Sequence, residues 1–141
     1  MRLRFFGRID LLPEDLQRDI DRAMEITKGY NDYYMNIAIA YGGRQELVEA
    51  SRRIAFSIAN GRLDPDEVNE MVLRSNLQTN GFPDPDLIIR TGGEKRMSNF
   101  LLFQSAYSEL VFTDTLWPEF EKEEFLKIVR DFSKRERRFG R

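Results

Sequence analysis

The sequence predicts an α/β fold in which helices flank a mostly parallel sheet. Short runs rich in β-forming residues alternate along the chain with longer stretches whose apolar residues recur at helical spacing. Two of these runs are almost continuously apolar, as expected for strands that are covered on both faces of a parallel sheet. A length of 141 residues fits one domain, so residues 1–141 are expected to form a single α/β domain.

The pattern predicts four strands, at residues 2–8, 33–41, 86–91 and, with a weaker signal, 109–113. Helical spacing predicts five helices, at residues 13–28, 44–60, 65–74, 98–107 and 122–138. Local signals support several boundaries, because Pro13 and Pro65 suit a first helical position and Asp64 can form a capping pair with Glu67. Gly29 and Gly61 suit helix ends.

Composition excludes several kinds of chemistry. The chain contains no Cys and no His, so disulfides, thiolate metal sites and imidazole catalysis are ruled out. Catalysis must use carboxylates, Arg or Lys, hydroxyls, backbone amides or an oxygen-bound metal. The net charge of −2 gives no general attraction to nucleic acid. With neither a membrane-spanning apolar run nor a leader-like start, we expect a cytoplasmic protein with at most peripheral membrane contact.

The segment that follows the third expected strand suits a phosphate group. The strand ends at Arg90, the pair Gly92 and Gly93 follows, and Arg96 and Ser98 come next. Glycines allow backbone N–H groups to turn toward a ligand, and guanidinium groups offer forked donors. Ser98 adds a hydroxyl at an expected helix start, whose dipole favours anions. A simple turn with paired surface charges is an equally good interpretation from these residues alone.

Three other places are candidates. Arg44 follows a second Gly-Gly turn and would share the phosphate pocket if both strand ends lie at one sheet edge, although a plain tight turn is the alternative. Glu109 begins an apolar run and could hold Mg²⁺, or be an ordinary solvated carboxylate. The basic C-terminal run, from Arg130 onward, suits a solvated helix end, a nucleic-acid contact or a tail that reaches a partner subunit.

Four segments together resemble the cis-prenyltransferases, the family that includes undecaprenyl and dehydrodolichyl diphosphate synthases. They are NIAIAYGGR at 36–44, DLIIRTGGEKRMSNFLLFQ at 86–104, AYSELVFTDTLWP at 106–118 and RERRFG at 135–140. The resemblance extends in order over nearly the whole chain, and it is to the C-terminal part of a family member. The resemblance strongly favours phosphate binding by the Gly-Gly segment over the alternative of a simple turn.

The resemblance implies roles for individual residues. Arg90, Arg96 and Ser98 match residues that hold the diphosphate of isopentenyl diphosphate, and Gly92 and Gly93 belong to the same block. Glu109 matches a carboxylate that helps to bind Mg²⁺. Arg138 and Gly140 match an Arg-x-Gly motif whose tail contacts the active site of the partner in a homodimer, and Arg44 matches a turn near the pocket. The implied reaction joins isopentenyl diphosphate to an allylic diphosphate.

The motif that carries the family's key catalytic residue is missing from this chain. Members carry an Asp-Gly-Asn-x-Arg loop whose Asp is the key catalytic residue, and no Asp-Gly-Asn occurs here. We therefore identify no catalytic residue and expect an incomplete version of the fold, with the isopentenyl diphosphate half-site and no activity alone. A truncated gene, a complementary N-terminal chain and a noncatalytic partner subunit are the three explanations. The intact RTGGE block argues against the third.

Overall fold

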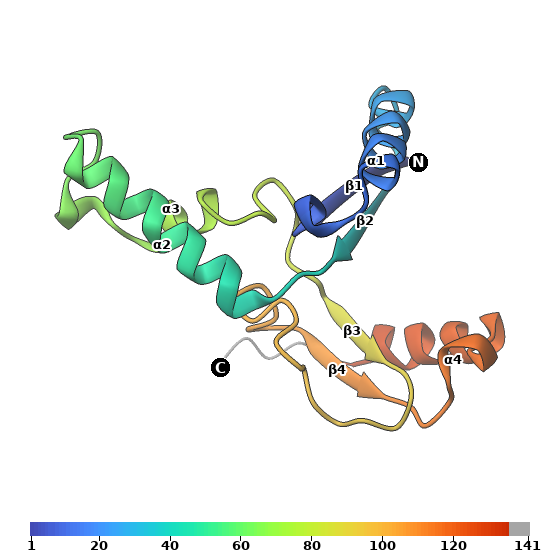
Figure 1. The fold of residues 1–141 in the computed structure, drawn as a ribbon. Helices are drawn as coiled ribbons and strands as arrows, with labels where there is room; N and C mark the ends of the chain where they lie inside the picture. The colour runs from blue at the N-terminus through green and yellow to red at the C-terminus, as the bar shows by residue number, and fades with distance from the viewer. Residues whose placement is uncertain (136–141) are drawn as a thin grey trace. The chain divides into compact units, whose positions relative to one another are not determined.

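The computed structural model describes residues 1–135, and the chain divides into two compact units, Met1–Phe82 and Pro83–Arg141 (Figure 1). Each unit contains its own two-stranded parallel sheet together with helices. The predicted α/β class is therefore confirmed. The prediction of a single domain over residues 1–141 stays a prediction. Within residues 1–135, no helix combines the length and apolar character needed to cross a membrane.

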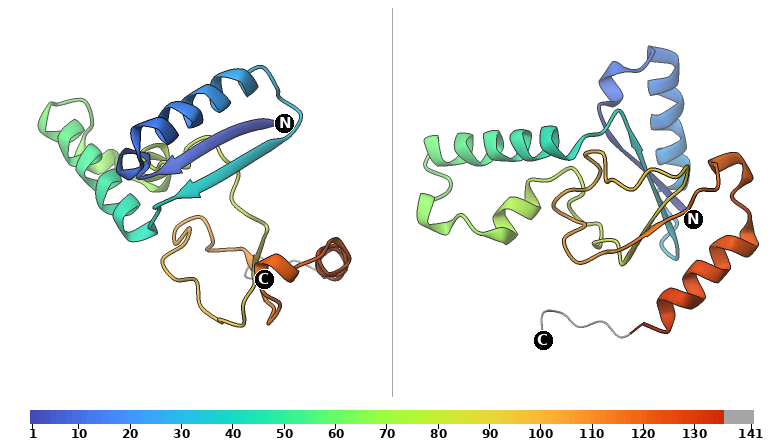
Figure 2. Two further views of the ribbon diagram at one scale, coloured as in Figure 1. Left: turned by 45° about the vertical axis from the view of Figure 1, so that its right-hand side comes forward. Right: turned by 90° about the horizontal axis from the view of Figure 1, so that it is seen from below.

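The first unit is built on two parallel strands, with Arg2 opposite Tyr34 and Gly7 opposite Ile39. The helix between the strands packs along the first of them, as the views in Figures 1 and 2 show. The elements of this unit are β1 (Arg2–Gly7), the 3₁₀ turn η1 (Ile9–Leu11), α1 (Glu14–Thr27), β2 (Tyr34–Ile39), α2 (Gly43–Ala59), the 3₁₀ turn η2 (Pro65–Glu67) and α3 (Glu70–Ser75).

The expected helix at residues 65–74 is two separate pieces. The predicted capping box is present, because the Asp64 carboxylate accepts the Asp66 N–H at 2.9 Å and the Glu67 carboxylate accepts the Asp64 N–H at 3.0 Å. This turn nevertheless ends at Val68, whose backbone is extended. Asn69 then caps a new helix by accepting the Val72 N–H at 3.1 Å. A second cap inside the helical pattern explains the break.

A small core holds the loop at residues 76–82 against the sheet. The Arg4 guanidinium lies 4.3 Å from the ring centre of Tyr34 and 4.9 Å from that of Phe82. The Phe6 ring packs in edge-to-face geometry with Tyr41 and with Phe82, at distances of 5.1 Å and 5.7 Å between ring centres. The buried apolar side chains are those of Phe6, Ile20, Ala50, Ile54 and Leu77.

Gly7 ends β1, opposite Ile39 at the end of β2. Its φ is +109°, in a region that favours glycine, and a Cβ atom built there would lie 2.0 Å from the carbonyl oxygen of Ile39. A side chain at this position cannot coexist with the observed approach of β1 to the end of β2. Only glycine at this position therefore allows the ends of β1 and β2 to lie as close together as they do.

The second unit has the same design. Leu87 lies opposite Glu109 and Arg90 opposite Phe112 in a parallel pair. Its elements are β3 (Leu87–Arg90), β4 (Glu109–Phe112), the 3₁₀ turn η3 (Trp117–Glu119) and α4 (Lys122–Ser133). The C-terminal part of the expected helix at residues 122–138 lies outside the described residues, and α4 itself ends at Ser133.

The expected helix at residues 98–107 is wrong. This segment contains only turns, such as the one closed by the Phe100 N–H on the Met97 carbonyl at 3.0 Å. Ser98, Asn99 and Leu101 have φ values of +47°, +66° and +45°, in the left-handed region. A right-handed helix cannot pass through three such residues.

The prediction that two strands are covered on both faces is also wrong for the described residues. The first half of β2 is exposed, and β3 is only half-buried along its length. Each sheet contains two strands, so each strand has one side without a neighbour in its sheet. The apolar runs therefore predicted the strands correctly but not their burial.

Candidate functional site

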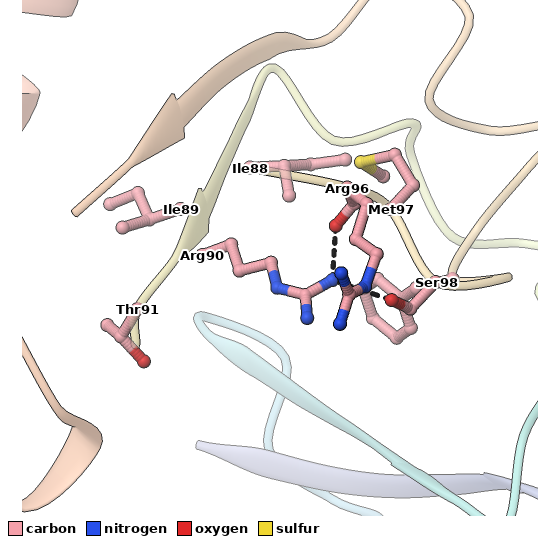
Figure 3. Close-up of a pocket in the computed structure, with 8 residues that line it drawn as sticks. Ile88, Ile89, Arg90, Thr91, Arg96, Met97 and Ser98 are labelled. Carbon is pink, nitrogen blue, oxygen red and sulfur yellow. Dashed lines mark hydrogen bonds between the residues drawn. The ribbon is translucent and has the colours of Figure 1, made fainter. Parts of the chain in front are cut away.

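A pocket of about 350 Å³ lies at the carboxyl end of β3 (Figure 3). It brings together three residues predicted from the sequence, Arg90, Arg96 and Ser98. In Figure 3 the side chains of both arginines extend into the space beside the segment that carries Ser98. The lining residues are Ile88, Ile89, Arg90, Thr91, Arg96, Met97, Ser98 and Phe100. The pocket therefore combines an apolar wall with two cationic groups and a hydroxyl.

Arg90 is held in place by the loop that follows its strand. Its Nη1 donates to the Ser98 Oγ at 2.8 Å and to the backbone carbonyl of Arg96. The left-handed backbone of Ser98 presents that hydroxyl to the guanidinium. Both contacts use Nη1, so the other nitrogens of the Arg90 guanidinium keep N–H donors for an anion.

Arg96 is more exposed, with 65% of its side chain accessible to solvent. Its Nη1 lies 2.5 Å from the Glu94 Oε2, in an ion pair between neighbouring side chains of the loop. Exposed ion pairs are weak, typically about 0–1 kcal/mol. An anion that enters the pocket can therefore compete with Glu94 for this guanidinium.

The Gly-Gly turn does not supply the predicted backbone donors. The N–H groups of Gly92 and Gly93 donate to the carbonyls of Thr115 and Thr113, both at 2.9 Å. Their φ values of +86° and +79° make this turn possible, and it ties the loop to the segment after β4. The prediction that these two amides face a ligand is wrong in this structure. Because residues 98–107 are not helical, no helix dipole contributes either.

Glu109 is the first residue of β4, and its Oε2 accepts from the Arg135 Nη1 at 2.8 Å. In the part of the chain from residue 1 to 135, no three acidic side chains gather closely enough to hold a metal ion. Mg²⁺ typically takes one or two carboxylates together with waters and substrate phosphates. Glu109 fits as one such ligand, and the described residues do not complete the site.

The roles of the three remaining predicted residues stay predictions. Arg44 is exposed in the first turn of α2 and belongs to the first unit, so its place in the same pocket stays a prediction. Arg138 and Gly140 lie outside the described residues. Their predicted contact with a partner subunit also stays a prediction.

Glu46 is the residue whose role the sequence reasoning missed. Its place just after a Gly-Gly turn indicates an ordinary turn residue that pairs with Arg44, but its side chain is only 1% exposed. Its carboxylate accepts from the Tyr41 hydroxyl at 2.6 Å and from the N–H groups of Gln78 and Thr79 at 2.9 and 3.3 Å. Helical spacing places Glu46 on the same face of α2 as the buried residues Ala50 and Ile54. This spacing is the sequence signal that indicates burial of Glu46.

We expect the Glu46→Ala variant to loosen the loop at residues 76–82. The change leaves the Tyr41 hydroxyl and two backbone N–H groups without this acceptor, at a cost of about 1–2 kcal/mol. Amide hydrogen exchange at Gln78 and Thr79 should become at least tenfold faster. The Glu46→Gln variant keeps a carbonyl acceptor and should show a smaller change. Unaltered exchange in Glu46→Ala would show that the carboxylate does not hold the loop.

Comparisons with known proteins point to one family. The prenyltransferase family described as undecaprenyl diphosphate synthase matches residues 1–140. A tritrans,polycis-undecaprenyl-diphosphate synthase (geranylgeranyl-diphosphate specific) from Methanopyrus kandleri is 54% identical over 139 residues, which are 99% of this chain and 51% of that protein. The enzyme of the same name from Pyrococcus furiosus is 50% identical over 141 residues, 100% of this chain and 53% of that protein.

A solved structure is also similar. Lavandulyl diphosphate synthase from Lavandula x intermedia, in complex with dimethylallyl diphosphate, matches 99% of this chain and 60% of its own with a TM-score of 0.96 and 38% identity. The chain spans about half the length of the curated relatives it matches. Since the family match covers residues 1–140 and these relatives are about half identical, the chain belongs to the cis-prenyltransferase family of undecaprenyl diphosphate synthases.

Proposed function

We propose that this chain carries the isopentenyl diphosphate half-site of a cis-prenyltransferase. The observation that carries the proposal is the pocket in which Arg90 is fixed beside Ser98 with Arg96 in the same lining. A diphosphate presents two linked groups of oxygen acceptors. Two guanidinium groups and a hydroxyl can donate hydrogen bonds to these oxygens, and the positive charge of the guanidinium groups complements the negative charge of the diphosphate.

The reaction of the family sets the role of these residues. An allylic diphosphate loses its diphosphate, the double bond of isopentenyl diphosphate attacks the allylic carbon, and loss of a proton leaves a cis double bond. In this chain Arg90, Arg96 and Ser98 bind and orient isopentenyl diphosphate by its diphosphate, which fixes the double bond for attack. Mg²⁺ would offset negative charge on the diphosphate groups, with Glu109 as one ligand. We assign no catalytic residue in this chain.

We further propose that the enzyme works as a dimer of synthase chains. The second unit exposes large apolar side chains, among them Tyr107 at 78% and Trp117 at 76%. Trp117 stacks on Phe120 with ring centres 6.2 Å apart, so these two rings form one apolar contact. Exposed apolar patches of this kind favour burial against another protein. The intact pocket supports a substrate-binding chain over a noncatalytic partner subunit.

Equilibrium dialysis with radiolabelled isopentenyl diphosphate tests the half-site. We expect the chain to bind this compound at least tenfold more tightly than isopentenyl monophosphate, because the second phosphoryl group engages the second guanidinium. With geranylgeranyl diphosphate and labelled isopentenyl diphosphate, the chain alone should form no elongated product. Equal binding of the two compounds would refute the diphosphate site. Robust elongation would refute the proposal that this chain carries only half of the active site.

A further inference from the structure

The loop that follows β3 is joined at its start to the segment that follows β4. The Gly92 N–H donates to the Thr115 carbonyl at 2.9 Å. The Gly93 N–H donates to the Thr113 carbonyl at 2.9 Å, and the Thr113 N–H donates to the Arg90 carbonyl at the same distance. The residues after β4 therefore set the path by which this loop leaves its strand.

A carboxylate of α4 binds the side chains of that segment. The Thr113 hydroxyl donates to the Glu124 Oε1 at 2.6 Å, and the Thr115 hydroxyl donates to the same oxygen at 3.2 Å. The Thr115 N–H donates to the Thr113 Oγ1 at 3.3 Å. All three residues are half-buried. Because hydrogen bonds to an ionised acceptor are stronger than those between neutral groups, this carboxylate ties both threonines firmly to the helix.

The position of Glu124 in its helix does not by itself explain these contacts. Glu123 and Glu124 both lie in the first turn of α4, where the helix dipole favours a negative charge. Glu123 is exposed, whereas Glu124 is half-buried against the two threonine hydroxyls. The dipole acts on both carboxylates, so the hydroxyl contacts are what distinguishes Glu124.

We propose that Glu124 is a positioning residue for the diphosphate pocket. It lies outside the pocket lining. Its carboxylate binds the two threonine hydroxyls, the two threonine carbonyls bind the Gly-Gly turn, and the loop then continues to Arg96 and Ser98. The ion pair of Arg96 with Glu94 lies within this loop, so it moves with the loop and does not fix it. The role rests on the proposed function, because it serves the binding of isopentenyl diphosphate.

Hydrogen exchange of the unliganded chain tests the link from Glu124 to the loop. In Glu124→Ala the two hydroxyls lose their acceptor, so the amides of Gly92 and Gly93 should exchange at least about fivefold faster. Glu124→Gln keeps a carbonyl oxygen as acceptor and should show a smaller increase. Glu123→Ala removes the same charge from the same helical turn and should leave both amides within about twofold of the unaltered chain. Unchanged exchange in Glu124→Ala would overturn the proposal.

Binding measurements test what this link does for the pocket. By titration calorimetry, Glu124→Ala should bind isopentenyl diphosphate at least about fivefold more weakly, with a smaller loss for Glu124→Gln and none for Glu123→Ala. A loosened loop displaces Arg96, whereas Arg90 is the last residue of β3. The preference for isopentenyl diphosphate over isopentenyl monophosphate should therefore fall at least about threefold in Glu124→Ala. A general loss of stability would weaken the binding of both compounds equally and leave this preference unchanged.

Two variants of Thr113 test the same route from its other end. Thr113→Val removes the hydroxyl with little change of shape and should reproduce the loss of affinity in Glu124→Ala. Thr113→Ser keeps the hydroxyl and should bind close to normally. The double variant Glu124→Ala/Thr113→Val should bind little more weakly than the weaker single variant, because both changes break the same hydrogen bond. Fully additive losses would contradict a shared route.

The failure of this proposal can be told apart from failure of the proposed function. If the unaltered chain does not bind isopentenyl diphosphate, the half-site is refuted and the role of Glu124 with it. If the unaltered chain binds this compound and Glu124→Ala binds it equally well, or loses no more affinity than Glu123→Ala, only the role of Glu124 is refuted. Should Glu124→Ala fail to fold, the comparison of Thr113→Val with Thr113→Ser decides the question by the same measurements.

Discussion

Replacing Arg90 with alanine should weaken the binding of isopentenyl diphosphate by 10- to 100-fold. Hydrogen bonds to charged groups are worth about 1.5–3 kcal/mol, and this guanidinium is already oriented by Ser98 and by the Arg96 carbonyl. Its removal takes away a cation and also releases the loop that carries the other two groups. Titration calorimetry with isopentenyl diphosphate, and with inorganic diphosphate, would measure the loss.

The Arg90→Lys variant separates charge from geometry. Lysine keeps the positive charge but cannot form the fork or the same contact with Ser98, so binding should still fall at least fivefold. Arg130→Ala is the matched control, because it removes an exposed arginine of α4 from the same unit and changes net charge equally. It should bind within twofold of the unaltered chain. Equal losses for Arg90→Ala and Arg130→Ala would point to general electrostatics and against a pocket.

The elements that alternate in the sequence could be predicted because their signals are local. The strands at β1 to β4 follow from runs of β-forming residues, and α1 and α2 from helical spacing with agreeing boundaries. The gathering of Arg90, Arg96 and Ser98 also follows from local order, since Arg90 ends β3 and the other two residues lie in the loop that follows it. A short loop brings its own residues together whatever the rest of the chain does.

The failures have two causes, a left-handed backbone within one segment and contacts between distant parts of the chain. Residues 98–107 have helical spacing, but three left-handed residues interrupt them. The amides of Gly92 and Gly93 are used by the segment after β4, which lies about twenty residues away in the sequence. Glu46 is buried because the distant loop at Gln78 and Thr79 needs an acceptor. None of these partners is visible in the residues next to them.

Replacing Gly7 with alanine should have the largest effect on stability. The new Cβ would lie 2.0 Å from the Ile39 carbonyl oxygen and 3.0 Å from its carbon, and both are backbone atoms that no side-chain rotation can move. The residue would also keep φ near +109°, which L-residues rarely adopt. The strand ends must separate, which also breaks the bond from the Gly7 N–H to Gln78. We expect a loss of at least about 4 kcal/mol from the first unit.

Two other glycines provide the controls for this change. Gly61 has φ of +65° and open space around its would-be Cβ, so Gly61→Ala should cost only the backbone strain of about 1 kcal/mol. Gly29 has open space and no strained φ, so Gly29→Ala should be neutral or slightly stabilising. The single Trp lies in the second unit, so hydrogen exchange of the β1 and β2 amides under increasing urea is the suitable measurement. If Gly7→Ala lowered the free energy of unfolding no more than Gly61→Ala, the backbone strain at positive φ would account for both losses. The close approach of Gly7 to Ile39 would then contribute nothing to stability.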